Sequence, residues 1–227
     1  AAAERIRDEE IDILVNLNGY FGTVRMGVFA HRPASIQVNY LGFPGTLAAP
    51  YIDYLIADRV VVPLDEKRHY SEKLVFLPGS YQANDAKRAI AGSDLTRADC
   101  GLPEQGSGQG FVFCNFNASY KLTPALFASW MRILAASENS VLWLLEGVPE
   151  FRANIRQQAA RHGIAETRLI FAGRLPMDEH LARLKLADLF LDTLPCNAHT
   201  TASDALWAGL PLITAKGTAF CGRVAAS

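Results

Sequence analysis

The chain of 227 residues is half hydrophobic and one-fifth charged, with a formal net charge of −1 at pH 7. This composition indicates a soluble globular protein with one large domain or two small ones. The near-zero charge gives no electrostatic reason to expect nucleic acid or an anionic membrane as a partner, and no apolar run is long enough to span a bilayer. We therefore expect neither partner.

The four cysteines lie far apart, form no Cys-x-x-Cys pair and have no histidine at a matching spacing. They indicate reduced thiols in the cytoplasm, and they predict neither a zinc site nor a disulfide framework. Residues 1–5 lack a signal-peptide core. The chain opens on charged residues directly before an expected strand and stops at residues 223–227 inside an expected helix, so we expect a fragment of a longer protein.

Residues 1–78 have the pattern of part of an α/β sheet. Apolar or alternating runs predict a weak helix at residues 24–29 and strands at residues 11–16, 35–41, 51–56 and 74–77. The turn at residues 42–46 contains two glycines, which let backbone amides approach a ligand closely, although an ordinary turn is the alternative.

Residues 79–109 are rich in small polar residues and lack periodicity, which predicts an inter-domain linker, with a mobile loop as the alternative. Strands and helices then alternate over residues 110–227. Strands are expected at 111–114, 141–145, 169–171, 189–191 and 212–214, and helices at 124–136, 150–162, 178–185, after Thr201 and at the end of the chain. This alternation predicts a parallel, doubly wound sheet with its ligand crevice at the carboxyl ends of the strands.

Three polar groups follow strands of this second domain and are expected at one edge of its sheet. Lys121 can neutralise a phosphate, and His180 and Arg183 share a helix face from which they can meet a base or ribose. The third group begins the next helix, where free amides and the helix dipole suit a pyrophosphate; it consists of His199, Thr200, Thr201 and Asp204. Taken singly, each group has an ordinary alternative: a solvated lysine, a surface helix start or simple helix capping.

Several familiar sites are not indicated. The sequence has no acidic pair after a strand, no Gly-x-Gly-x-x-Gly fingerprint, no Walker lysine motif and no Gly-x-Ser-x-Gly elbow. The three polar groups therefore favour a nucleotide-linked donor that is held without a metal ion or cofactor.

The chain resembles the protein O-linked N-acetylglucosamine transferases and their SPINDLY-type relatives over nearly its whole length. The matching pieces are residues 13–20, 32–37, 41–46, 70–74, 115–117 with 120–121, 140–145, 186–188 with 191–193, 196–197 with 199–201, and 206–209. The resemblance implies a GT-B architecture of two Rossmann-like domains: an incomplete acceptor-side domain at residues 1–78, the linker at 79–109, and a nearly complete nucleotide-sugar-binding domain at 110–227 that is truncated at its end.

The resemblance also implies an inverting transfer of N-acetylglucosamine from UDP-GlcNAc to Ser or Thr hydroxyls of a protein or peptide acceptor. Lys121 would hold the diphosphate and stabilise the leaving UDP. The remaining roles fall to His199, Thr200 and Thr201 for the phosphates and nearby sugar, Asp204 for the ribose, His180 and Arg183 for the uracil and ribose, and Leu41, Gly42 and Pro44 for the transferred sugar.

The general base and the tetratricopeptide repeats of the family lie outside this chain, so we expect the fragment alone to lack full activity. The alternatives are protein O-fucosyl transfer from GDP-fucose, a non-catalytic nucleotide-sugar-binding module, and a GT-B enzyme with a small-molecule acceptor. Ala118 and Met177 differ from the glutamine and lysine of animal members, which leaves the donor base and sugar open.

Overall fold

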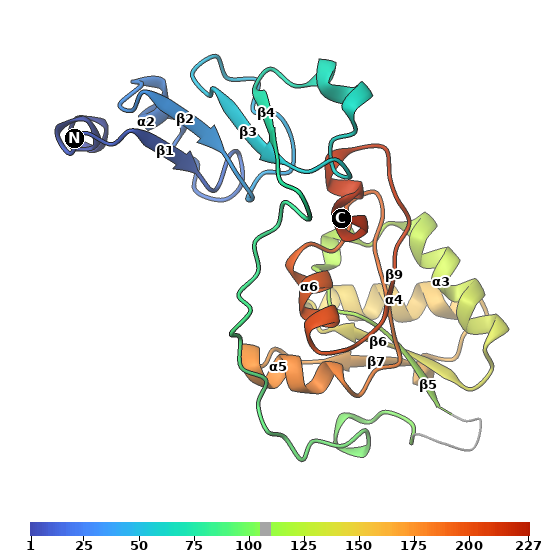
Figure 1. Ribbon diagram of the computed structural model, residues 1–227. Helices are drawn as coiled ribbons and strands as arrows, with labels where there is room; N and C mark the ends of the chain where they lie inside the picture. The colour runs from blue at the N-terminus through green and yellow to red at the C-terminus, as the bar shows by residue number, and fades with distance from the viewer. Residues whose placement is uncertain (105–109) are drawn as a thin grey trace. The chain divides into compact units, whose positions relative to one another are not determined.

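The computed structural model describes residues 1–104 and 110–227. It divides into two compact units, one formed by residues 1–83 and 218–227 and the other by residues 84–217. Each unit has its own parallel sheet, and the two sheets are seen separately in Figure 1. The expected α/β class with two parallel sheets is confirmed.

The first unit has a four-stranded sheet in the order β1-β2-β3-β4, with all neighbours parallel. Its elements are α1 (Ala2–Asp8), β1 (Ile13–Asn16), α2 (Met26–Ala30), β2 (Ile36–Asn39), β3 (Tyr54–Ala57), the 3-10 helix η1 (Leu64–His69) and β4 (Lys73–Phe76). The sequence pattern located every strand within a few residues but gave no sign of α1, whose residues are all at least partly exposed and therefore show no apolar face.

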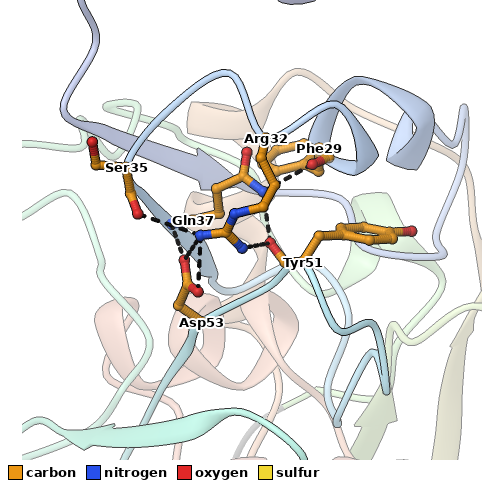
Figure 2. Close-up of polar contacts among 6 residues, drawn as sticks. All are labelled: Phe29, Arg32, Ser35, Gln37, Tyr51 and Asp53. Atoms are coloured by element: carbon orange, nitrogen blue, oxygen red, sulfur yellow. Dashed lines mark hydrogen bonds and ion pairs between the residues drawn. The ribbon is translucent and has the colours of Figure 1, made fainter.

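A polar cluster ties together the loops that lead into β2 and β3 (Figure 2). The guanidinium of Arg32 donates to both carboxylate oxygens of Asp53 at 3.1 Å and to the Tyr51 carbonyl at 3.2 Å. The buried Gln37 amide donates to the carbonyls of Phe29 at 2.9 Å and Tyr51 at 2.6 Å. Because these bonds lie near the amino ends of the strands, they stabilise the sheet at the end opposite to the carboxyl ends, where open α/β sheets bind ligands.

Residues 218–227 belong to the first unit, whereas all of residues 110–227 were expected in the second domain. Phe220 and Val224 are buried in the cluster around Tyr81, and the rings of Phe220 and Tyr81 meet edge to face at 5.1 Å. Arg223 pairs with Glu66 at 2.9 Å. In place of the helix expected at the end, the chain has two 3-10 turns, Phe220–Gly222 and Val224–Ala226.

The second unit has a five-stranded parallel sheet in the order β7-β6-β5-β8-β9. Its elements are β5 (Phe111–Asn115), α3 (Pro124–Ala136), β6 (Ser140–Leu145), α4 (Pro149–Arg161), β7 (Leu169–Ala172), α5 (Met177–Leu184), β8 (Leu189–Leu191), α6 (Thr200–Trp207) and β9 (Leu212–Ile213). Apolar side chains of α3 and α4 form the main core with one face of the sheet. Helices α5 and α6 lie on the other face (Figure 1), so the doubly wound sheet is confirmed.

This strand order places the topological switch point between β5 and β8. The chain runs outward from β5 to β7 and then crosses back to β8 on the other side of β5. The loops after β5 and β8 therefore leave toward opposite faces, and open α/β sheets bind ligands in the crevice between two such loops. The loop after β5 contains Lys121, and the loop after β8 leads to His199.

Much of the segment expected to be a linker belongs to the second unit, since that unit begins at Asn84. The buried Arg97 contacts the carbonyls of Leu186 and Gly110 and pairs with Asp188 at 2.8 Å. Residues 105–109 of the expected linker lie outside the described residues. Within the described parts of the chain, no helix has the length and apolar character needed to cross a bilayer.

Candidate functional site

Side chains continue the pairing of β5 and β8 beyond the strands. Asn115 donates to the Leu191 carbonyl at 2.6 Å, and the Asn117 amide donates to the Thr193 hydroxyl at 3.1 Å. The Lys121 ammonium then donates to the Asn197 carbonyl at 2.6 Å. Each pair is 76 residues apart in sequence. The ammonium of Lys121 is thus held at the switch point, against the loop that leads to His199.

Asp192 organises the loop between β8 and α6. Its buried carboxylate accepts hydrogen bonds from the amides of Thr193 at 2.7 Å and Ala198 at 2.6 Å and from the Thr214 hydroxyl at 2.6 Å. Burial raises the pKa of this carboxyl, although the three hydrogen bonds and Lys121 oppose the shift. Asp192 was not among the predicted site residues, although it directly follows an expected strand.

Helix α6 begins without a side-chain cap. His199 occupies the N-cap position and makes no side-chain hydrogen bond to the first turn. The Thr201 hydroxyl bonds instead to the Asn117 side chain, while Thr200 is exposed. Neither Thr200 nor Thr201 therefore caps α6. Two buried atoms beside this helix start, Asn197 Oδ1 and His199 Nε2, have no hydrogen-bond partner among the described residues.

The predicted pair on α5 also reaches the loop after β5. Arg183 is buried, stacks over the Phe116 ring at 4.8 Å, and donates to His180 Nδ1 at 3.0 Å and to the Gly173 carbonyl at 2.5 Å. The edge of Phe116 meets His180 at 5.4 Å. Because Nδ1 accepts from Arg183, the proton of the neutral imidazole is on Nε2, where it can be donated. Phe116 was not among the predicted site residues.

We expect His180 to make the second unit less stable as the pH falls. Burial, with the nearby Arg183 charge, lowers the pKa of His180 from 6.5 to about 4. The unfolded chain therefore binds this proton first, and stability is lost as pH drops from the unfolded pKa toward the folded one. Urea unfolding at several pH values between these limits will show a weaker pH dependence for His180→Gln than for the wild type. Equal slopes for the two proteins would contradict the assignment.

Asp204 lies one turn into α6 and is buried, with 3% of the residue exposed. Its carboxylate forms an ion pair with Arg88, which comes from the segment expected to be a linker. The predicted residues Lys121, His180, Arg183, His199, Thr200, Thr201 and Asp204 all belong to the second unit.

Leu41, Gly42 and Pro44 belong to the first unit, in the loop after β2. Leu41 has a positive φ of 71°, and a Cβ at Gly42 would lie 1.9 Å from the Leu17 carbonyl oxygen. Only glycine fits there, because the loop presses against backbone. The buried Glu72 holds the far end of the loop, accepting from the Thr46 hydroxyl and the Leu47 amide at 2.6 Å each. The loop shape is therefore fixed by backbone contact.

Among the described residues, no group of three or more His, Cys, Asp or Glu side chains is arranged to hold a metal ion. In the second unit, Lys121 contacts the loop before the uncapped start of α6, and the Arg183–His180 pair contacts Phe116 of the loop after β5. Such a set suits a diphosphate linked to a nucleoside.

Two α/β units with parallel sheets, the second with this site at its switch point, fit the class of GT-B glycosyltransferases. The structure matches an O-GlcNAc transferase mutant, K341M, from Thermobaculum terrenum with a TM-score of 0.85 and 31% identity, covering 100% of this chain and 42% of that one. It also shares the fold of Anabaena HepE, solved with UDP and glucose, at a TM-score of 0.59 and 14% identity, covering 95% of this chain and 62% of the other.

The chain belongs to glycosyl transferase family 41, whose model matches residues 1–94 and 91–227. It is 44% identical to the probable UDP-N-acetylglucosamine–peptide N-acetylglucosaminyltransferase SEC of Arabidopsis thaliana, over 100% of this chain and 23% of that protein. It is 32% identical to the corresponding rice protein SPINDLY, over 99% of this chain and 24% of that protein. The chain thus spans about a quarter of the length of these relatives, and the predicted family resemblance is confirmed.

Proposed function

We propose that this chain forms the donor-binding part of an inverting glycosyltransferase that moves N-acetylglucosamine from UDP-GlcNAc to Ser or Thr hydroxyls of proteins. The observation that supports this most directly is the Lys121 ammonium, held at 2.6 Å from the Asn197 carbonyl beside the uncapped start of α6. A fixed cation beside a helix start supplies the positive charge and the backbone amides that a departing diphosphate requires. The names of the family 41 relatives agree with this donor and acceptor.

The chemistry follows from where charge develops. The acceptor oxygen bonds to the anomeric carbon as that carbon's bond to the β-phosphate oxygen breaks, and the hydroxyl proton leaves to a base that we do not assign to this chain. Negative charge grows on the diphosphate during this step. Lys121 and the amides of α6 stabilise that charge more in the transition state than in the bound donor, so they accelerate the reaction without a metal ion.

The other contacts would bind and orient the donor. His199, Thr200 and Thr201 would meet the phosphates, and Asp204 would accept from the ribose hydroxyls. His180, with its proton on Nε2, and Arg183 would lie beside the base. Leu41, Gly42 and Pro44 of the first unit would line the pocket of the transferred sugar. A protein acceptor, a cytoplasmic location and a parent protein with tetratricopeptide repeats form part of the same proposal.

A thermal-shift comparison of UDP, UDP-GlcNAc, GDP and GDP-fucose tests the donor. A ligand at about 100 times its Kd stabilises the folded state by about 2.7 kcal/mol, which corresponds to several degrees in Tm. We expect UDP and UDP-GlcNAc to raise the Tm and the guanosine compounds to leave it unchanged. A shift with GDP species alone would contradict the uridine donor and indicate fucosyl transfer, and no shift with any of the four would contradict nucleotide-sugar binding.

A further inference from the structure

Arg88 joins the donor site from a segment that precedes the second sheet. Its guanidinium pairs with the Asp204 carboxylate, and the two side chains are only 17% and 4% exposed. It also lies over the Trp207 ring at 6.0 Å, and the Trp207 indole donates to the Arg88 carbonyl at 3.2 Å. Residue 88 is therefore fastened to α6 by side-chain and backbone contacts.

An unpaired carboxylate at Asp204 would oppose binding of an anion at the start of α6. Asp204 is four residues after Thr200, or about 6 Å along the helix axis. At such a separation a buried negative charge repels a diphosphate by an amount that changes affinity about tenfold or more. The same region has unsatisfied polar atoms: Asn197 Oδ1, His199 Nε2 and Arg88 Nε are buried without a hydrogen-bond partner among the described residues. Asn197 itself is 0% exposed, so the Arg88–Asp204 pair lies among buried polar groups whose hydrogen bonds the described residues do not complete.

We propose that Arg88 is a positioning residue of the donor site: by neutralising Asp204, it lets the start of α6 hold a nucleoside diphosphate. The proposal rests on the proposed function, since it concerns the same ligand. In this role a residue that precedes the second sheet takes part in donor binding. The ion pair with Arg88 cancels the charge of the Asp204 carboxylate and leaves that carboxylate oriented for hydrogen bonds.

The test is calorimetric titration of UDP into the 227-residue chain and four variants. Arg88→Met leaves Asp204 uncompensated, and we expect it to weaken UDP binding about tenfold. Arg88→Lys keeps the positive charge and should stay within about threefold of the wild type. Arg88→Met combined with Asp204→Asn removes both charges but keeps a side-chain oxygen that can accept from the ribose, so UDP should bind it more tightly than Arg88→Met alone. Lys87→Met, a neighbouring exposed cation, is the matched control and should bind like the wild type.

The outcomes separate this inference from the proposed function. If the wild type does not bind UDP, the proposed function fails and the inference falls with it. If the wild type binds UDP and Arg88→Met binds it equally well, only the inference is overturned. If Arg88→Met melts at a lower temperature, the double variant decides: recovery of UDP affinity supports neutralisation, whereas a Tm that recovers without the affinity overturns it, because cancelling both charges would then not restore binding.

Discussion

We expect the replacement of Lys121 by alanine to lower the turnover of the proposed donor, UDP-GlcNAc, in the full-length protein by about 10²- to 10³-fold and to weaken donor binding far less. Removing one preorganised donor to a developing negative charge costs about this much in other enzymes. Lys121 is suited to that role because its ammonium is anchored by the Asn197 carbonyl at 2.6 Å and so does not need to be ordered during the reaction. The measurement is steady-state turnover alongside the Kd for UDP-GlcNAc.

Lys185→Ala provides the matched control, because this lysine also belongs to the second unit but is exposed at the end of α5. It should leave both turnover and Kd unchanged. If Lys121→Ala instead weakens binding by the same factor as it lowers turnover, the lysine serves ground-state binding alone. That result would favour the alternative of a module that binds nucleotide sugars without catalysis.

Local sequence signals were sufficient where an element depends on its own residues. Helix α3 has the predicted bounds, because Thr123 caps it by accepting from the Leu126 amide, Pro124 begins it, and Phe127, Trp130, Met131 and Leu134 form one apolar face. The site at the switch point was also predictable in outline, since alternating strands and helices place polar loops at one sheet edge.

Contacts between distant residues could not be predicted in the same way. The pairing of Asn115, Asn117 and Lys121 with partners 76 residues later depends on β5 lying next to β8, which only the strand order reveals. Arg88 and Arg97 looked like charges in a polar linker because their partners on α6 and before β8 are about a hundred residues away. Phe116 received no role from the sequence, although it stacks with the predicted Arg183.

The second large effect should come from Arg97→Met, which we expect to destabilise the second unit by about 3 kcal/mol. Arg97 is 8% exposed and donates to the Leu186 and Gly110 carbonyls at 2.9 Å each. It also pairs with Asp188 at 2.8 Å, and Asp188 accepts from the Val112 amide at 2.8 Å. Losing the guanidinium leaves a largely buried carboxylate and two carbonyls without their partner, and breaking a buried pair in this way costs about 3–5 kcal/mol.

Urea unfolding measures this loss, with Arg174→Met as the control because Arg174 is an exposed arginine of the same unit. The control should change stability by less than about 0.5 kcal/mol. Adding Asp188→Asn to Arg97→Met should recover part of the loss, since it removes the uncompensated charge. A loss below about 1 kcal/mol for Arg97→Met would mean that residues 84–104 contribute little to the folding of the second unit. Arg88 would then be held against α6 by its own contacts alone, because the Arg97 contacts to Leu186, Gly110 and Asp188 would add little to hold the following segment in place.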